Sequence, residues 1–544
     1  MKNNIPLTII ICAASLLFSG CLDDTFPTEY AGASQIGASE QALEALSNST
    51  IAFMYAYNYF DTHYPSEFGY PAMMIMRDAL TDCSYVSTNN NHFTTPWVSL
   101  MRMYEYKTTG VAALDAQADR NEIWGLTAVI VDEHSDGRDA DNNPRAPYYV
   151  MYRFILNDLN RAEIYLDGYN RPAKNRPDQS VVHALKARLW LEIATRLQRY
   201  PDDLQTLIIH ETDNELAEKY PPLHIASALE CYQKAAEYAR KVIDKYTPLT
   251  QAQWHSVTNG FNDMSVPAWV FAISVNTPNA VYTRLNNFLS HCVTEYSRGY
   301  SRSQYHCYRM IDKRLYDKID DEDWRKVTWK DPADFDGRPA AGADVEPVPP
   351  QYYTLFRGTT PSIDGNTLDW EWRHRDPYVG FKFRPKGGDI SENWRNAQQV
   401  DYPLIRVEEM YFIEVEAKAY TDGLAAGIDA LTSFLNTHRY RNGSYSIAPT
   451  DIDDFVDNYL ITQKRIELWG EGLSYFDIKR RALPLVRGYD GTNWLASRRF
   501  NSIQGYTPAW LNYYIPIEGE ASLNSAIRLN PDPMVLESYG LWVN

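Results

Sequence analysis

Apolar residues at helical spacing are the feature of this sequence that most constrains its fold. In the segment 152–166 they recur every three or four positions, as Tyr152, Ile155, Leu159, Ala162 and Leu166. A second set follows the same rule, as Ile225, Leu229, Tyr232, Ala236, Ala239, Ile243 and Tyr246. Residues three and four apart lie on one face of a helix, so each set predicts a helix that buries one apolar stripe.

The segment 181–197 between these sets carries small residues where neighbouring helices would touch. Ala184, Ala187 and Ala194 stand among larger apolar residues there, and small side chains allow close helix contacts. A helix, a turn and a second helix with alanines at the contacts resembles the tetratricopeptide plan, in which each pair buries its face against the next pair.

A second helical block is predicted after residue 400. The segments 404–420, 427–443 and 457–481 read as helices; Asn442-Gly443 ends the second, and Gly470 and Gly472 interrupt the third. Residues 247–400 lose the helical period and are rich in Pro, Gly, Asp, Trp and Tyr. We therefore expect a mostly α-helical chain with helical blocks near 150–246 and 404–481 and a loop-rich variable region over 247–400.

The first twenty residues have the form of a cleaved export signal. The apolar run 5–18 follows Lys2 and is shorter than the roughly 20 apolar residues that a membrane-spanning helix needs. Ser19 and Gly20 place small side chains before Cys21, which resembles a bacterial lipobox, although Phe18 stands where leucine is usual. We expect residues 1–20 to be a lipoprotein signal peptide and Cys21 to carry the lipid; an ordinary signal peptide cut elsewhere is the alternative.

The net charge bears on the class of partner, and the cysteines bear on disulfide bonds and metal sites. The formal net charge is −18, and a field of that sign repels phosphate backbones, so we expect no nucleic-acid partner. Six cysteines in 544 residues are too few for a disulfide scaffold. Cys292 and Cys307 could pair or stay free, and no Cys-x-x-Cys or metal-ligand spacing is present.

No catalytic motif stands out. Gly-x-Ser-x-Gly, His-Glu-x-x-His and phosphate-loop patterns do not occur, and the calcium-like run 136–143 lacks the central glycine and final glutamate. Acids and arginines within 406–416 and 465–480 are expected to pair with one another where helices meet. We expect no enzymatic activity, no metal and no cofactor.

Several motifs in order carry a resemblance to a known family. They are YRFILNDLNRAEIYL, AAEYARKVID, VPAWVFAISVN, RMIDKRLYDKIDDEDWRK, YPLIRVEEMYFIEVEAKAY, LNTHRYRNG, KRIELWGEGLSYFDIKRR and YYIPIEGEASLNSAIRLNPDP. From about residue 150 to the C-terminus this series resembles the SusD/RagB family of Bacteroidetes outer-membrane lipoproteins. The resemblance implies a single SusD-like domain over residues 21–544, with four tetratricopeptide-like helix pairs and an irregular ligand-binding half.

The same resemblance implies a function. Such proteins capture oligosaccharides or polysaccharide at the cell surface and deliver them to a SusC-like TonB-dependent transporter. Asp23 and Asp24 resemble the acidic pair that directs such lipoproteins to the cell exterior. The alternatives are a peptide-binding lipoprotein of a RagAB-like importer, a secreted glycoside hydrolase and a periplasmic helical scaffold.

Three segments have the composition of a sugar-binding platform. Sugar rings stack their C–H faces on Tyr or Trp while polar side chains bond the hydroxyls, so exposed aromatics on loops are required. The segments 82–97, 294–305 and 369–376 fit this description. Their candidate ligand-binding residues are Tyr85, Asn90, Trp97, Tyr296, Tyr300, Trp370 and Trp372.

Overall fold

A computed structural model describes the two helical blocks and several shorter segments, all within the unit Met54–Asn544. The blocks are residues 142–256 and 401–494. The shorter segments are 74, 77–78, 81–85, 126–132, 260–261, 263–274, 310–334, 377–378, 380, 382–383, 496, 499–502, 524–527 and 540–542.

The first block is an array of helices whose ends follow the local sequence. Asp178 caps the helix that begins at Gln179, and Ser227 caps the helix that begins at Ala228. Each side chain accepts a hydrogen bond from a backbone N–H of the first turn, that of Val181 and that of Glu230 respectively. The helices are α7 (Tyr148–Tyr165), α8 (Gln179–Arg199), α9 (Pro201–Glu211), α10 (Asn214–Lys219), α11 (Ala228–Ile243) and α12 (Gln251–His255).

The second block contains two long helices followed by shorter ones. They are α17 (Val407–Thr421), α18 (Leu424–His438), α19 (Ile452–Asp454), the π-helix η7 (Phe455–Leu460), α20 (Ile461–Glu467) and α21 (Ser474–Arg481). The predicted interruption near Gly470 and Gly472 is confirmed, because both have positive φ angles, 86° and 71°, in the turn between α20 and α21.

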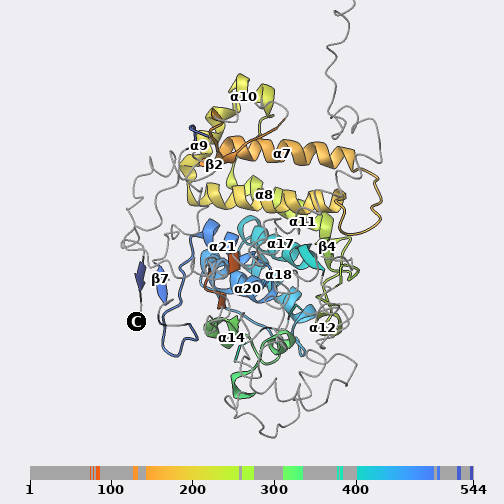
Figure 1. Ribbon diagram of the computed structural model, residues 1–544, viewed down its shortest axis with the longest axis vertical. Coiled ribbons are helices and arrows are strands. Elements are labelled where there is room, and N and C mark those ends of the chain that lie inside the picture. The colour runs from red at the N-terminus through yellow and green to blue at the C-terminus, as the bar shows by residue number, and fades with distance from the viewer. Residues whose placement is uncertain are drawn as a thin grey trace, which may run out of the picture. The chain divides into compact units, whose positions relative to one another are not determined.

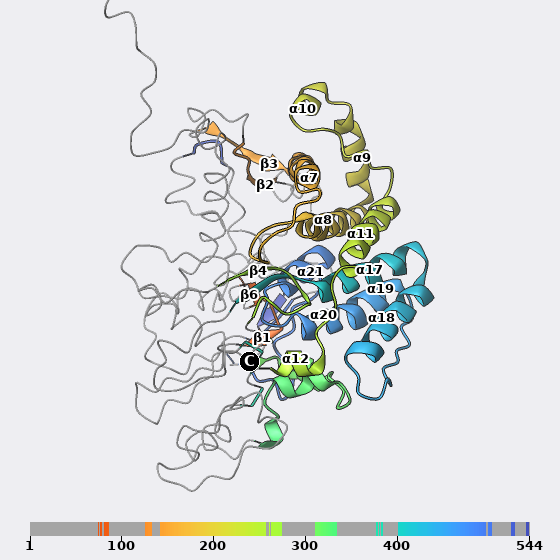
Figure 2. The same ribbon diagram turned by 90° about the vertical axis from the view of Figure 1, so that its right-hand side faces the viewer.

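The long helices pack one after another, in the order α7, α8, α11, α17 and α18 (Figures 1 and 2). The alanines of α8 make this possible, since Ala184, Ala187 and Ala194 are completely buried. Ala235 and Ala239 play the same part on α11. The prediction of a mostly α-helical fold is confirmed, while the number of tetratricopeptide-like pairs stays a prediction.

Short antiparallel strand pairs join distant parts of the chain. β1 (Ser84–Tyr85) pairs with β5 (Met310–Ile311), and β2 (Leu126–Val129) pairs with β3 (Arg145–Pro147). β4 (Trp269–Ile273) pairs with β6 (Tyr402–Arg406), and β7 (Phe500–Ser502) pairs with β8 (Gly540–Trp542). The intervening chain adds α14 (Lys313–Asp317) and the 3₁₀ turns η4 (Trp324–Thr328) and η5 (Pro332–Asp334).

The turn around Gly472 holds an early segment of the chain against this block. The Gly472 N–H donates to the Asp78 carboxylate at 3.0 Å, and the Val486 N–H donates to Asp82 at 3.0 Å. A Cβ on Gly472 would lie 2.7 Å from the Cα of Met74. Glycine is required here by its backbone conformation and by this close approach.

Two sequence predictions need correction. The helix expected to begin at residue 404 begins at Val407, because residues 402–406 form a strand with 269–273. The stripe predicted on α11 is also wrong in part. Leu229 is 47% exposed, and the buried face includes Cys231 and Val242, because α8 and α17 both pack against this helix.

The described residues contain neither a membrane-spanning helix nor a cluster of metal ligands. Within them, no helix combines the length and apolarity that crossing a bilayer requires, and no group of three His, Cys, Asp or Glu side chains is placed to hold a metal ion. Of the cysteines in these segments, Cys83 and Cys231 are free and buried.

Candidate functional site

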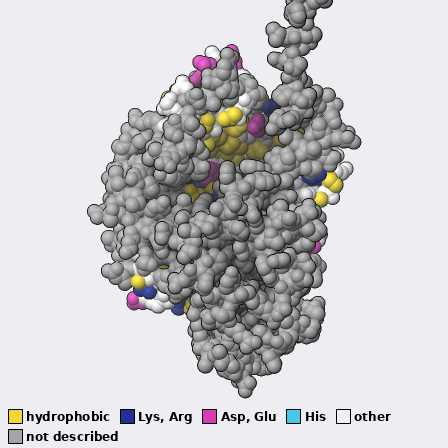
Figure 3. Space-filling view, in the orientation of Figure 1, with side chains coloured by type: hydrophobic (Ala, Val, Ile, Leu, Met, Phe, Trp, Pro, Cys, Tyr) yellow, Lys and Arg dark blue, Asp and Glu magenta, His cyan; other side chains and the backbone are white. Residues whose placement is uncertain are grey.

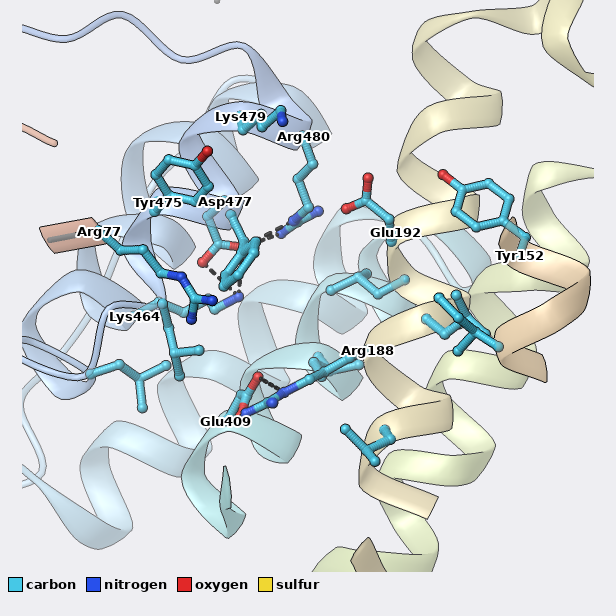
Figure 4. Close-up of a pocket in the computed structure, with 18 of the residues that line it drawn as sticks. Arg77, Tyr152, Arg188, Glu192, Glu409, Lys464, Tyr475, Asp477, Lys479 and Arg480 are labelled. Atoms are coloured by element: carbon cyan, nitrogen blue, oxygen red, sulfur yellow. Dashed lines mark hydrogen bonds and ion pairs between the residues drawn. The ribbon is translucent and has the colours of Figure 1, made fainter. Parts of the chain in front are cut away.

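A cavity of about 610 Å³ opens between α8 and the α20–α21 region (Figure 4). This volume lies within the range of about 300–1,000 Å³ that small-molecule sites usually have. In the view of Figure 3, hydrophobic side chains of the described residues gather at the level of α7 and α8. The cavity is therefore a candidate binding site among the described residues.

One wall comes from α7 and α8. Leu185, Leu189 and Glu192 of α8 line the cavity at spacings of four and three, which places them on one face of the helix. Ile155 and Leu159 of α7 line it at a spacing of four. This wall is aliphatic, and Glu192 adds a carboxyl group to it.

The opposite wall comes from α17, α20 and α21. Ile413 of α17 and Leu468 at the end of α20 contribute aliphatic side chains, and Leu473 adds a third at the start of α21. Phe476 is 43% exposed, and the Arg77 guanidinium lies 4.8 Å from the centre of its ring. A ligand in the cavity would contact apolar surface on both sides.

Most charged side chains that line the cavity form ion pairs with other charged side chains. Arg188 donates to both oxygens of Glu409, from Nε at 2.7 Å and from Nη2 at 2.6 Å. Figure 4 shows this pair at one end of the cavity and Arg480 toward the other. Bidentate arginine–carboxylate pairs are strong and fixed in geometry, so the Arg188–Glu409 pair serves as a rigid part of the wall.

Arg480 is held in the same way from behind. Its Nη1 and Nη2 atoms donate to the two oxygens of Glu416, each at 2.6 Å, and its Nε donates to Asp477 at 2.9 Å. Lys464 also donates to Asp477, at 2.8 Å. Burial opposes ionisation of the Asp477 carboxyl, but Lys464 and Arg480 keep its pKa below the usual range.

Glu192 and Lys479 differ from these groups. Neither side chain makes a hydrogen bond or an ion pair with the described residues. Burial raises the pKa of Glu192, against the opposing effects of Arg480, Arg196 and Lys479, and burial lowers the pKa of Lys479. Both side chains line the cavity and are only partly buried, so each can take a polar partner there.

The arrangement is suited to binding. It offers aliphatic walls, fixed ion pairs and two charged side chains, Glu192 and Lys479, that make no hydrogen bond or ion pair with the described residues (Figure 4). An apolar pocket with a few convergent polar groups is the usual form of a small-molecule site.

The acids and arginines that the sequence predicted to be structural are buried and paired. Arg406 bonds Glu467 and Glu471 at distances of 2.9–3.2 Å, and Glu467 also accepts from Arg325 and Arg439. All of these lie within the core. The expectation that acids and arginines of these two segments pair with one another is confirmed for Arg406, Glu467 and Glu471.

The predicted ligand-binding residues are not brought together by the described part of the structure. Tyr85 lies in β1, where the backbone alone is described. The other candidates lie outside the described residues: Asn90, Trp97, Tyr296, Tyr300, Trp370 and Trp372. Cys21, Asp23, Asp24, Cys292 and Cys307 also lie outside them.

Sequence reasoning missed the cavity, although a signal for it was present. Arg188 and Glu192 share a helix face with Leu185 and Leu189. Charged residues at the apolar positions of a helix mark a place where that face meets either a partner charge or a cavity. Arg188 meets Glu409 and Glu192 meets the cavity.

Part of the chain resembles a known sequence family. Residues 347–531 match the sequence model of the SusD family. No curated protein sequence matches the chain.

Solved structures match over nearly the whole chain. A SusD-like carbohydrate binding protein from Bacteroides vulgatus is 19% identical, with a TM-score of 0.53, over 89% of this chain and 96% of the other. SusD superfamily proteins from Bacteroides thetaiotaomicron and Parabacteroides distasonis are each 14% identical, with TM-scores of 0.55, over 90% of this chain and 99% and 98% of the others.

At such identities these likenesses establish the fold, and the family match rests on the C-terminal part of the sequence. The predicted SusD-like fold is confirmed. Residues 347–531 thus match the SusD family model, and the chain shares its fold with SusD-like proteins.

Proposed function

We propose that this chain is a carbohydrate-binding lipoprotein of the outer membrane that faces the cell exterior. In this proposal Cys21 carries the lipid anchor, and Asp23 and Asp24 direct the protein outward. The bound oligosaccharide or polysaccharide passes to a SusC-like TonB-dependent transporter. The chain binds its ligand and does not cleave it.

One observation carries the proposal. The fold matches that of a SusD-like carbohydrate binding protein over 89% of this chain and 96% of that one, so an insertion or deletion of a whole domain does not separate them. The aromatic-rich segments 82–97 and 294–305 have the composition that sugar stacking needs. Fold alone does not fix a ligand, so the ligand has to be tested directly.

The test is binding of residues 22–544 to a panel of polysaccharides and peptides, by affinity gel electrophoresis and calorimetry. We expect a response to at least one polysaccharide and at least a tenfold loss of affinity in Trp97→Ala or Tyr300→Ala. Tyr165→Ala is the matched control, because Tyr165 is an exposed aromatic on α7, 76% accessible, outside the proposed platform.

The alternatives give different results in the same experiment. A response to peptides with silence across sugars would replace the carbohydrate proposal with that of a peptide importer. Release of reducing ends from any polysaccharide by the purified protein would overturn the proposal that the chain is not an enzyme.

The location is tested separately. We expect a Cys21→Ala variant to leave the outer-membrane fraction, because the anchor depends on acylation of that thiol. Digestion of the wild-type protein by protease added to intact cells would support exposure at the surface. Membrane retention of the Cys21→Ala variant would contradict the anchor.

A further inference from the structure

We propose that the cavity between α8 and α21 binds a small apolar carboxylate, with its apolar body along Leu185 and Leu189 and its carboxylate paired with the ammonium group of Lys479. This goes beyond the proposed carbohydrate binding and does not depend on it.

The walls select an apolar body. Ile155, Leu185 and Leu189 form one side, and Ile413 and Leu473 lie on the other. Aliphatic side chains offer a sugar neither a flat ring for stacking nor hydrogen bonds for its hydroxyls. An alkyl or aryl group would replace water along both walls, and burying apolar surface is favourable by about 25 cal/mol per Å².

The charge of the lining selects an anionic head. The cavity is lined by five cationic side chains and three acidic ones, and Glu416 behind Arg480 adds a fourth acid. The cations are Arg77, Arg188, Lys464, Lys479 and Arg480, and the acids are Glu192, Glu409 and Asp477. A cation placed here would meet an excess of positive charge, whereas an anion would offset it.

Lys479 is the group that the anion would meet. Arg188, Lys464 and Arg480 already bond carboxylates at 2.6–2.9 Å, while Lys479 has no hydrogen bond or ion pair with the described residues. The Lys479 side chain lines the cavity and is only partly buried, so its ammonium group is accessible to a bound carboxylate.

Glu192 is compatible with an anion at this place. Burial raises the pKa of Glu192, which disfavours its charged form beside the head group. Three cations act on Glu192, namely Arg480, Arg196 and Lys479. A ligand with an ammonium head would be repelled by the same three groups.

The experiment compares three probes that differ in the head group alone. Decanoate, decanol and decylamine are titrated by calorimetry into residues 22–544, below the concentrations at which they form micelles. We expect decanoate to bind at least tenfold more tightly than decanol and decylamine not to bind. 3-Phenylpropanoate tests whether an aryl body is accepted in place of an alkyl chain; binding of decanoate or 3-phenylpropanoate supports the class, and silence from both overturns it.

Two variants locate the site. Lys479→Met should lower the affinity for decanoate at least tenfold and leave the affinity for decanol unchanged. Leu185→Trp, which fills the cavity from α8, should abolish the binding of both probes. Lys241→Met is the matched control, because Lys241 is an exposed lysine of α11 that pairs with Glu237. Urea unfolding of each variant confirms that it is folded.

The outcomes separate this proposal from the proposed function. Unchanged decanoate affinity in Lys479→Met, or equal binding of decylamine, would overturn the anionic head. Trp97→Ala should leave decanoate binding intact, so loss of sugar binding and loss of carboxylate binding report on different parts of the chain.

Discussion

Arg406 holds Glu471 by three hydrogen bonds inside the core: Nε donates to Oε2 at 3.0 Å and to Oε1 at 3.2 Å, and Nη2 donates to Oε1 at 2.9 Å. The same arginine donates to Glu467, which also accepts from Arg439. Lys382 adds a third donor to Glu471, at 2.5 Å. Strand β6 and the turn after α20 are therefore joined through one buried network.

Removing one charge from this network should be costly. We expect Glu471→Gln to lower the free energy of unfolding by about 3–5 kcal/mol, because it leaves buried cations with a weaker partner. Urea denaturation measures this. Glu237→Gln is the control, since Glu237 is 60% exposed and pairs with Lys241 on the surface of α11; it should cost less than about 1 kcal/mol. Equal losses in the two variants would contradict the role of the network.

The network also predicts sensitivity to acid. Burial opposes ionisation of Glu467, yet Arg439, Arg325 and Arg406 hold its pKa well below the usual range. Below pH about 4.5 the unfolded chain takes up a proton that the folded chain does not, so the free energy of unfolding falls as the pH decreases. Unfolding measured between pH 6 and pH 3 should show a steeper loss in wild type than in Glu467→Gln. A parallel pH dependence would show that this carboxyl group is not responsible.

The turn at Gly472 should be intolerant of any side chain. Its φ angle is +71°, and a Cβ would lie 2.7 Å from the Met74 backbone. We expect Gly472→Ala to destabilise the protein by about 2–4 kcal/mol, from the left-handed conformation and the clash together. Gly443→Ala isolates the first effect, because Gly443 has a φ of +65° with nothing within 4 Å of the added Cβ; it should cost about 1–2 kcal/mol.

Two cysteines should resist alkylation in the folded protein. Burial raises the pKa of Cys83 and of Cys231 to about 12, and the thiolate is the reactive form. After treatment with iodoacetamide at pH 8, peptide mapping by mass spectrometry should find both unmodified without denaturant and both modified in urea. Rapid labelling of either in the native protein would contradict its burial.

Periodicity predicted the long helices because local residues decide them. The stripe containing Tyr152 and Leu159 became α7, and the alanines of 181–197 became the contacts of α8. The same reasoning placed residues 404–406 in a helix, although they pair with a strand more than 130 residues earlier. A local pattern carries no information about so distant a partner, which is why strand β6 was missed.

The candidate site was harder to predict for the same reason. The spacing of Arg188 and Glu192 on α8 can be read from the sequence, but their surroundings depend on α17 and α21. Glu409 was expected to be structural, and the structure gives it a bond to Arg188, 221 positions away. The packing of the helices decides whether an inward-facing charge meets a partner or faces a cavity.

The contact between Asp78 and the Gly472 turn has a consequence for synthesis. The bonded positions are 394 residues apart, and the Asp82–Val486 bond spans 404. Contacts between such distant positions close late, because the intervening chain must first be ordered. A nascent chain supplies the Gly472 donor only after residue 472 is made and the Val486 donor only after residue 486, so the early segment around Asp78 and Asp82 waits for both. A product truncated before residue 472 would therefore lack both of these contacts to the early segment.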